Sequence, residues 1–212
     1  MQLALKRCIA FSVLAVLSVI FIDKPLALWI HSNHFDNLVF FEYITEDLPM
    51  VLSWAAVFLL IFVRPSVNIG NRWLYIVYLF WLTETTIYVK QGLKGVFARY
   101  WPKTWIHGNL SLIGDNVYGF NWFGGFAFNG GAFPSGHTTL VGIICLSLAI
   151  LYPQFARLWY FLIALIIFSL LMMDFHFLGD CFAGLALASL FAGFGFAFYQ
   201  YLLRKFSKPE NT

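Results

Sequence analysis

The chain has 212 residues, of which 61% are hydrophobic, 20% aromatic and only 11% charged, and its formal net charge is +3. A soluble domain of this size is about half apolar and about a quarter charged, so the composition excludes a disordered chain, a nucleic-acid-binding module and an ordinary cytosolic enzyme. Because the mean hydropathy of the chain is +0.78, we expect an integral membrane protein. Cys8, Cys145 and Cys181 form no CxxC pair and are interpreted as small buried hydrophobic residues.

Six apolar runs lie between the charged residues, and we interpret them as transmembrane helices. They fall at about 8–22, 48–63, 73–89, 138–152, 158–173 and 181–203. Several are shorter than the roughly 20 residues of a spanning helix, but their apolar and aromatic flanks supply the missing turn. Because they are apolar on every face, they do not fit the alternating polarity of barrel strands. The predicted fold is therefore all-α: one membrane-embedded domain, residues 1–212, forming a polytopic bundle of six transmembrane helices with an interfacial cap.

The first run follows Lys6 and Arg7, as the apolar core of a signal peptide would. No A-x-A-like cleavage site follows it, so we expect an uncleaved membrane anchor. With the N-terminus inside, the cytoplasmic segments carry eight cations and one anion, and the outer segments five cations and eight anions. This distribution follows the positive-inside rule. We predict a multi-pass inner or plasma membrane protein with both termini in the cytoplasm.

Two predicted outer segments, 23–47 and 90–134, are too long to be simple turns. We expect the first to form one or two short interfacial helices. Its His31 and His34 have a spacing that suits a metal, but we identify no third ligand in the segment and interpret them as solvated surface. Loops longer than about 15 residues are usually functional or disordered. The second segment is rich in glycine, tryptophan and phenylalanine, which favours an ordered cap at the lipid interface.

The predicted topology brings three polar clusters to the outer face: Lys94 with Arg99, Pro134-Ser135-Gly136-His137, and His176 with Asp180. Ionisable groups at membrane depth are costly and are candidates for function. Ser135 is a plausible N-cap of the fourth span. Free N–H groups at a helix start bind anions, and the helix dipole adds to the attraction. Gly136 would let a ligand approach the backbone closely.

His176 and Asp180 are four residues apart and would share one face of a helix. A carboxylate on one imidazole nitrogen fixes the tautomer and leaves the other nitrogen free to attack or to accept a proton. Each cluster alone also has a structural interpretation: an ordinary N-cap, a self-satisfied His–Asp pair, or snorkelling cations. Together they offer an anion cradle, an oriented nucleophile and a second histidine as proton donor, which suits phosphoryl transfer without a metal.

This order of motifs resembles the type 2 phosphatidic acid phosphatase family, in its bacterial membrane lipid phosphatase branch, which shares an active-site design with vanadium haloperoxidases. The motifs cover residues 94–180. The resemblance implies hydrolysis of a lipid phosphate or pyrophosphate through a phosphohistidine intermediate, without metal or other cofactor. From the predicted topology we expect this site on the periplasmic or extracellular side. The resemblance also implies His176 as nucleophile, Asp180 as its orienting carboxylate and His137 as general acid. The implied phosphate-binding residues are Lys94, Arg99, Ser135 and Gly136.

Two arginines of the family pattern are missing. The first motif has Lys, six residues and then Arg-Pro, but Trp101 precedes Pro102 here; the third begins Ser-Arg, but this chain has Ser169-Leu170. A charge-assisted hydrogen bond contributes about 1.5–3 kcal/mol, so each loss corresponds to roughly ten- to a hundred-fold in rate. We expect Arg99 to replace one of the two.

Three functional hypotheses remain at this point. The first is a lipid phosphatase acting on phosphatidic acid, phosphatidylglycerol phosphate, undecaprenyl pyrophosphate or phosphorylated lipid A. The second is a non-catalytic phospholipid-binding or transport protein, favoured by the missing arginines and by Glu84 within the third span. The third is a zinc hydrolase using His137, His176 and Asp180, which would have no known ligand spacing. We expect the lipid bilayer and a membrane lipid that carries a phosphate as partners, and no nucleic acid.

Overall fold

The computed structural model describes residues 1–105, 108–126 and 130–206. Within them the chain is helical, with two isolated β-bridges, Arg99–Phe120 and Trp101–Ser111, and no strand. The all-α prediction is confirmed. The elements are α1 (Gln2–Phe21), α2 (Asp23–Ser32), η1 (Phe35–Asn37), α3 (Val39–Phe62), α4 (Arg72–Phe97), α5 (Leu112–Asp115), η2 (Gly124–Phe126), α6 (Gly136–Leu151), η3 (Pro153–Phe155), α7 (Ala156–Met172) and α8 (Leu178–Phe206).

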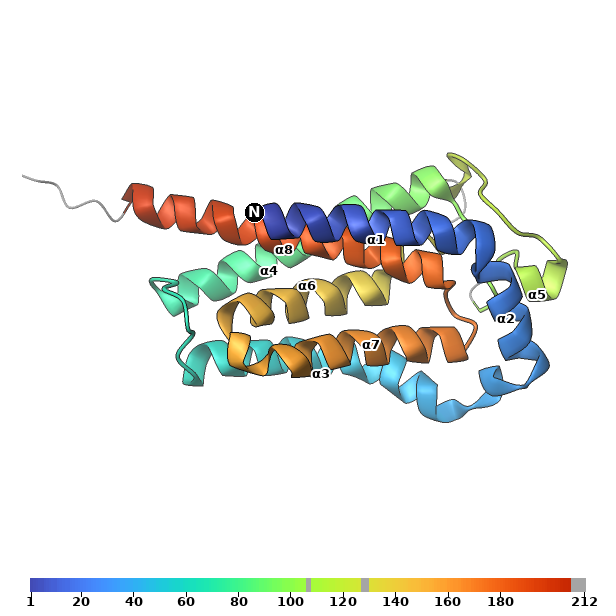
Figure 1. The fold of residues 1–212 in the computed structure, drawn as a ribbon, viewed down its shortest axis with the longest axis horizontal. Coiled ribbons are helices and arrows are strands. Elements are labelled where there is room, and N and C mark those ends of the chain that lie inside the picture. The colour runs from blue at the N-terminus through green and yellow to red at the C-terminus, as the bar shows by residue number, and fades with distance from the viewer. Residues whose placement is uncertain (106–107, 127–129, 207–212) are drawn as a thin grey trace, which may run out of the picture.

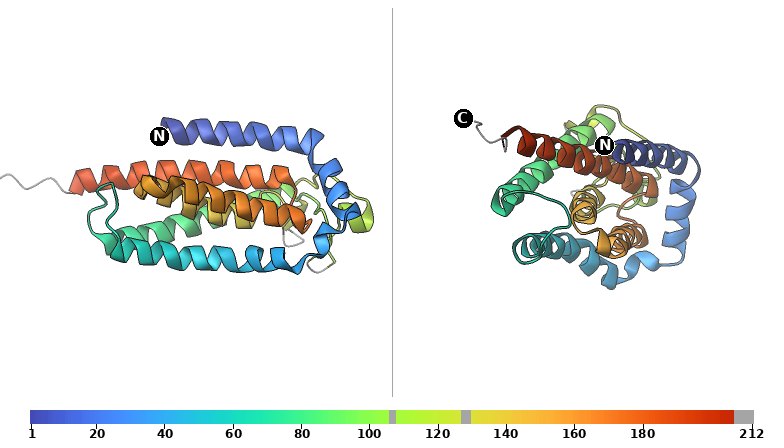
Figure 2. Two further views of the ribbon diagram at one scale, coloured as in Figure 1. Left: turned by 60° about the horizontal axis from the view of Figure 1, so that its bottom comes forward. Right: turned by 60° about the vertical axis from the view of Figure 1, so that its left-hand side comes forward.

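The long helices run along the long axis of the molecule, and α2 crosses one end of the bundle (Figure 1). Helix α6 is central, because it packs against α3, α4, α7 and α8. Two further views show the same arrangement, with α1 lying along α8 (Figure 2). The site-bearing start of α6 therefore lies at the end of the bundle that α2 covers.

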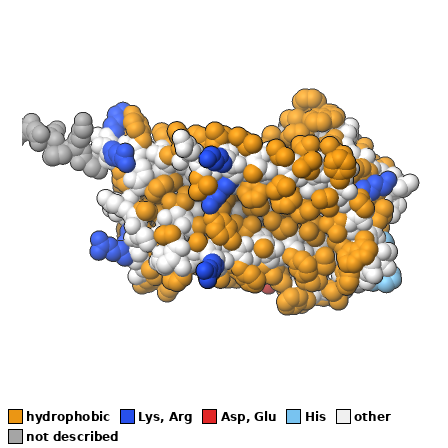
Figure 3. All heavy atoms as spheres, in the orientation of Figure 1, with side chains coloured by type: hydrophobic (Ala, Val, Ile, Leu, Met, Phe, Trp, Pro, Cys, Tyr) orange, Lys and Arg blue, Asp and Glu red, His pale blue; other side chains and the backbone are white. Residues whose placement is uncertain are grey.

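Apolar side chains fill the core of the bundle, and many large ones are also exposed on its outside. They cover much of the face seen in Figure 3. Helices α1, α3 and α8, and the helical stretch Pro153–Met172, are long and apolar enough to cross a membrane. Helix α6 has only 16 residues, and the charged residues Glu84, Lys90 and Lys94 interrupt the apolar run of α4. The apolar helices fit a membrane protein, as its composition predicted.

Helices α3 and α4 extend furthest beyond their predicted spans. Helix α3 begins at Val39, so the last part of the predicted outer segment 23–47 is helical, while α2 and η1 form the rest. Helix α4 continues to Phe97 and places Lys90 and Lys94 on its final turns. Hydropathy marks where lipid contact ends, whereas a helix ends where its backbone hydrogen bonds end. Helix α4 ends at Ala98, which adopts a left-handed conformation and donates its N–H to the Lys94 carbonyl.

Smaller predictions have mixed outcomes. Cys145 and Cys181 are buried as expected, whereas Cys8 is half-buried. The threonines on either side of Glu84 donate to carbonyls one turn earlier in α4. Glu84 itself makes no hydrogen bond or ion pair with the part of the chain that the structure describes.

Candidate active site

The three predicted polar clusters meet at one end of the bundle. The imidazole rings of His137, at the start of α6, and His176, between α7 and α8, have centroids 6.4 Å apart. The Trp101 ring lies 5.1 Å from the His176 ring, and the Lys94 ammonium lies 5.0 Å from the Trp101 ring. Residues separated by more than 80 positions in the sequence therefore share one small site, as the topology predicted.

His176 and Asp180 form a buried pair, with 3.3 Å between Nδ1 of the histidine and Oδ2 of the aspartate. The expectation that they share a helical face needs correction, because α8 begins only at Leu178. Asp180 instead reaches back over the helix start, where its Oδ2 also accepts the Phe177 N–H at 3.0 Å. A carboxylate on Nδ1 selects the tautomer that leaves Nε2 unprotonated and free to react. Burial lowers the pKa of His176, which favours this neutral form.

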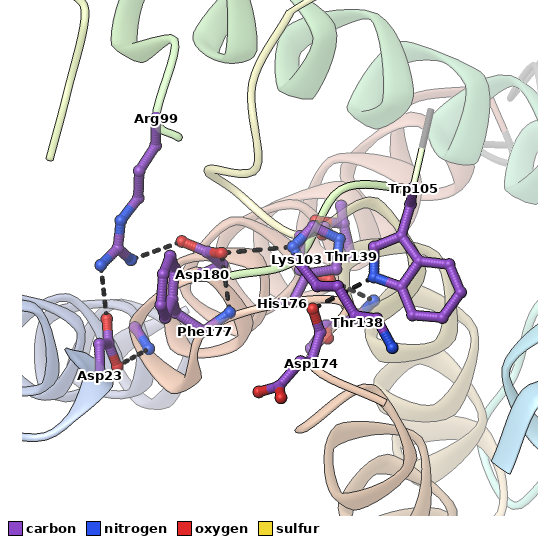
Figure 4. Close-up of polar contacts among 12 residues, drawn as sticks. Asp23, Arg99, Lys103, Trp105, Thr138, Thr139, Asp174, His176, Phe177 and Asp180 are labelled. Atoms are coloured by element: carbon purple, nitrogen blue, oxygen red, sulfur yellow. Dashed lines mark hydrogen bonds and ion pairs between the residues drawn. The ribbon is translucent and has the colours of Figure 1, made fainter. Parts of the chain in front are cut away.

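Asp180 is in turn held by Arg99, whose Nη1 donates to its Oδ1 at 2.6 Å. The Nη2 atom donates to Oδ2 of Asp23 at 2.8 Å and to the Tyr118 hydroxyl at 3.0 Å. Figure 4 shows Arg99 between the two carboxylates, all three side chains being fully buried. The structure thus places Arg99, predicted as a phosphate ligand, on the carboxylate behind His176.

Asp23 was not among the predicted site residues. It begins α2, and its second oxygen accepts the Gly179 N–H at 2.9 Å, beside Asp180. Burial raises the pKa of Asp23, while the Arg99 charge lowers it. In the sequence Asp23 looks like one of several outer acids, and only its position next to an apolar segment hints at burial.

The start of α6 has the predicted anion-binding form. Ser135 is the N-cap, as expected, and its Oγ accepts the Thr138 N–H at 3.3 Å. Its own N–H donates to the Asp180 carbonyl at 3.0 Å, which joins this helix start to α8. The N–H groups of Gly136 and His137 donate no hydrogen bond to the described residues. These two groups are available to an anion.

Two lysines and a histidine nitrogen surround this helix start. Lys94 is only 9% exposed, and neither it nor Lys90 has a hydrogen-bond or ion-pair partner in the described parts of the chain. The Lys90 ammonium lies 3.4 Å from the point that a Cβ at Gly136 would occupy. Nδ1 of His137 is buried and has no hydrogen-bond partner within the described ranges of the chain. Lys90 was not among the predicted site residues, although its spacing of four from Lys94 places both on one face of a helix.

A separate cluster lies nearby. His31 Nδ1 and the Lys103 ammonium contact Oδ2 of Asp36 at 2.9 and 2.8 Å. With Asp174, His31 and Asp36 offer three possible metal-ligand atoms within 4.8 Å of one another. The residues that could bind a metal together with His31 are therefore these two aspartates, and His34 is not part of the group. Lys103 neutralises Asp36, while Oδ1 of Asp36 and Oδ2 of Asp174 are buried without a hydrogen-bond partner in the described parts of the chain.

Comparison with protein families matches residues 75–204 to the PAP2 superfamily, that of the type 2 phosphatidic acid phosphatases. The match spans more than half of the chain, and the chain belongs to this superfamily. It includes all the predicted site residues and leaves out Asp23, on α2. No curated protein and no solved structure matches the chain.

Proposed function

We propose that this member of the PAP2 superfamily is a membrane lipid phosphatase that hydrolyses a lipid phosphate or pyrophosphate through a phosphohistidine intermediate, without a metal. The observation that carries the proposal is the meeting of a neutral, oriented His176 with an unpaired cationic helix start. Family membership suggests phosphatase activity, and this geometry suggests how it is performed.

The first step is phosphate binding. The N–H groups of Gly136 and His137 point out of the start of α6, and Lys90 and Lys94 supply two positive charges. The Ser135 hydroxyl accepts from the backbone and retains its own proton to donate. Such preorganised donors stabilise the charge that develops on the phosphoryl oxygens in the transition state.

The second step is transfer to the enzyme. Nε2 of His176 forms a bond to phosphorus as the bond to the lipid oxygen breaks, and protonated His137 gives its proton to that oxygen. Asp180 stabilises the positive charge that develops on the His176 ring. In the third step, neutral His137 takes a proton from water, whose oxygen attacks phosphorus. As the water oxygen bonds to phosphorus, the bond between phosphorus and Nε2 of His176 breaks, inorganic phosphate leaves, and both histidines return to their starting states.

The role proposed for Arg99 differs from phosphate binding. Its guanidinium is committed to Asp180 and Asp23, so it acts as a positioning residue that fixes the carboxylate behind His176. The two lysines then supply the charge that arginines provide in the family pattern.

The proposed membrane arrangement has six spans, α1, α3, α4, α6, α7 and α8, in one domain with both termini in the cytoplasm. The site lies at the outer face, where α2 and the described parts of residues 98–134 form the interfacial cap. Arg7 donates to the Tyr160 hydroxyl at 2.6 Å, so the starts of α1 and α7 lie at the same end of the bundle. This agrees with a cytoplasmic start for both helices.

The test is phosphate release by detergent-purified protein in EDTA, using phosphatidic acid, phosphatidylglycerol phosphate, undecaprenyl pyrophosphate and phosphorylated lipid A. We expect release from at least one of them, and its loss in His176→Ala. Activity that disappears with EDTA would contradict the metal-free mechanism.

One observation favours a second candidate function, namely lipid binding without turnover: no arginine contacts the start of α6 among the described residues, because Arg99 is held by carboxylates. Saturable binding of phosphatidic acid vesicles with no phosphate release would favour this candidate over the phosphatase.

A further inference from the structure

An apolar cavity of about 510 Å³ lies between α1, α4 and α8. Its lining is almost entirely hydrophobic, with Ser12 as its most polar side chain. Two of its three walls, α1 and α8, are helices apolar enough to span a membrane. A polar ligand would lose its hydration there without gaining hydrogen bonds, so the cavity suits a hydrocarbon occupant.

The cavity is elongated along the helices. On α1 it is lined by Cys8, Ser12, Val16 and Ile20, which are spaced one turn apart on a single face. At 1.5 Å per residue, this wall is about 18 Å long. On α8 the lining extends from Ala183 to Leu190. A long apolar space parallel to these helices has a shape that suits an extended acyl chain.

One end of the cavity reaches the proposed phosphate site at three points in the chain. Pro134 directly precedes Ser135, and Leu93 directly precedes Lys94. Ala183 precedes Gly184, where an added Cβ would lie only 2.8 Å from the Ser135 carbonyl oxygen. Residues that line the apolar cavity are therefore direct neighbours of residues at the cationic helix start, as the acyl chain and the head group of one lipid molecule would require.

Aromatic rings form the wall nearest the site. Phe97, Phe120 and Phe133 pack against one another with ring centroids 4.8–6.0 Å apart, and all three line the cavity. The Arg99 guanidinium covers Phe120 at 5.3 Å from the ring centroid. The arginine that holds Asp180 therefore also contacts one ring of this wall.

We infer that this cavity between α1, α4 and α8 binds one acyl chain of the lipid phosphate and so makes long-chain lipids the preferred substrates. The inference rests on the proposed phosphatase function. The chain would lie along α1, with its ester end at Pro134 and its methyl end toward Cys8. Water-soluble phosphate esters would use the same catalytic groups but would gain no binding energy from the cavity, because they have no acyl chain.

The test compares two valines of α1. Val16 lines the cavity and is 59% exposed, whereas Val13 is 52% exposed and does not line it. Because both are surface positions, Val16→Trp and Val13→Trp should fold equally well, and only the first narrows the cavity. Each protein is assayed in mixed micelles with dioleoyl phosphatidic acid, and in parallel with dihexanoyl phosphatidic acid and p-nitrophenyl phosphate.

We expect Val16→Trp to raise KM for the dioleoyl lipid roughly tenfold, about the effect of losing two buried methylene groups. Its kinetics with p-nitrophenyl phosphate, and all kinetics of Val13→Trp, should match those of the unmodified chain. Equal KM values of Val16→Trp and Val13→Trp for the dioleoyl lipid would overturn the inference, and so would an unmodified enzyme that does not prefer dioleoyl to dihexanoyl chains. Either result leaves p-nitrophenyl phosphate hydrolysis intact, whereas failure of the proposed function abolishes hydrolysis of all three substrates.

Discussion

Arg99 donates a 2.6 Å hydrogen bond to Asp180, the residue that accepts from Nδ1 of the proposed nucleophile His176. The same guanidinium binds Asp23 at the start of α2. The buried Arg99 guanidinium, shared by two carboxylates, thus joins the start of α2 to the first turn of α8. This link explains how an arginine away from the family's usual position can still serve the site.

The first prediction concerns stability. Removing one partner of a buried ion pair costs about 3–5 kcal/mol, because the remaining charge is left unpaired. Arg99→Met should therefore lower the unfolding temperature strongly, as measured by thermal unfolding in detergent. Arg64→Met is the control, since Arg64 is exposed and has no partner among the described residues. Equal unfolding temperatures of the two variants would show that the Arg99 network contributes little.

The second prediction concerns the lysine pair. If each ammonium makes a charge-assisted hydrogen bond to phosphate, Lys90→Ala and Lys94→Ala should each reduce kcat/KM by roughly ten- to a hundred-fold. Lys90→Arg should retain most of the activity, because it keeps the charge. Lys24→Ala, at an exposed position of α2, is the matched control. A Lys90→Ala enzyme with unchanged kcat/KM would remove Lys90 from the proposed site.

The third prediction concerns the pH dependence of the rate. Burial lowers the pKa of His176 below its ordinary value of 6.5, so the neutral, nucleophilic form persists at pH 6.5 and is lost only at lower pH. The rate should therefore fall on the acid side below pH 6.5, and on the alkaline side as His137 loses the proton it must donate. A rate profile that is flat between pH 5 and 8 would contradict these paired roles.

The fourth prediction concerns Asp174. Burial, assisted by the negative charge of Asp36, raises the pKa of Asp174 to about 8. Because this folded-state pKa lies above the unfolded value, the group favours folding at low pH, and that contribution is lost as pH rises from about 4 to 8. Asp174→Asn cannot ionise, and asparagine tolerates the positive φ of 50° at this position.

We therefore expect Asp174→Asn to unfold at a higher temperature than the unmodified chain at pH 8, and at nearly the same temperature at pH 4. A gain of 1 kcal/mol corresponds to roughly 2–4 °C for a chain of this size. A lower unfolding temperature at pH 8 would mean that the Asp174 carboxylate is charged and stabilised in the fold.

Much of the fold follows from the sequence, because apolar runs specify membrane helices directly. Each of the six predicted spans corresponds to a helix. The bounds of α3 and α4 were not predictable from hydropathy, since helical hydrogen bonding continues through Glu42 and through Lys94. That extension matters for function, because it places Lys90 and Lys94 on one helical face.

The members of the site were more predictable than their contacts. Short motifs predicted His137, His176 and Asp180 as members of the proposed site, and the predicted N-cap at Ser135 was confirmed. The partner of Arg99 could not be inferred, because Asp23 is 76 residues away and outside the motifs. Only three-dimensional packing shows that α2 brings this carboxylate to the arginine.

The central claim is that Nε2 of His176 attacks phosphorus, and trapping the intermediate tests it most directly. The purified protein is mixed with ³²P-labelled phosphatidic acid in EDTA, quenched within one turnover, and digested so that the labelled peptide can be identified. The account predicts label on the peptide that contains His176, and none in His176→Ala. Phosphate release without any labelled peptide, or label retained in His176→Ala, would contradict it.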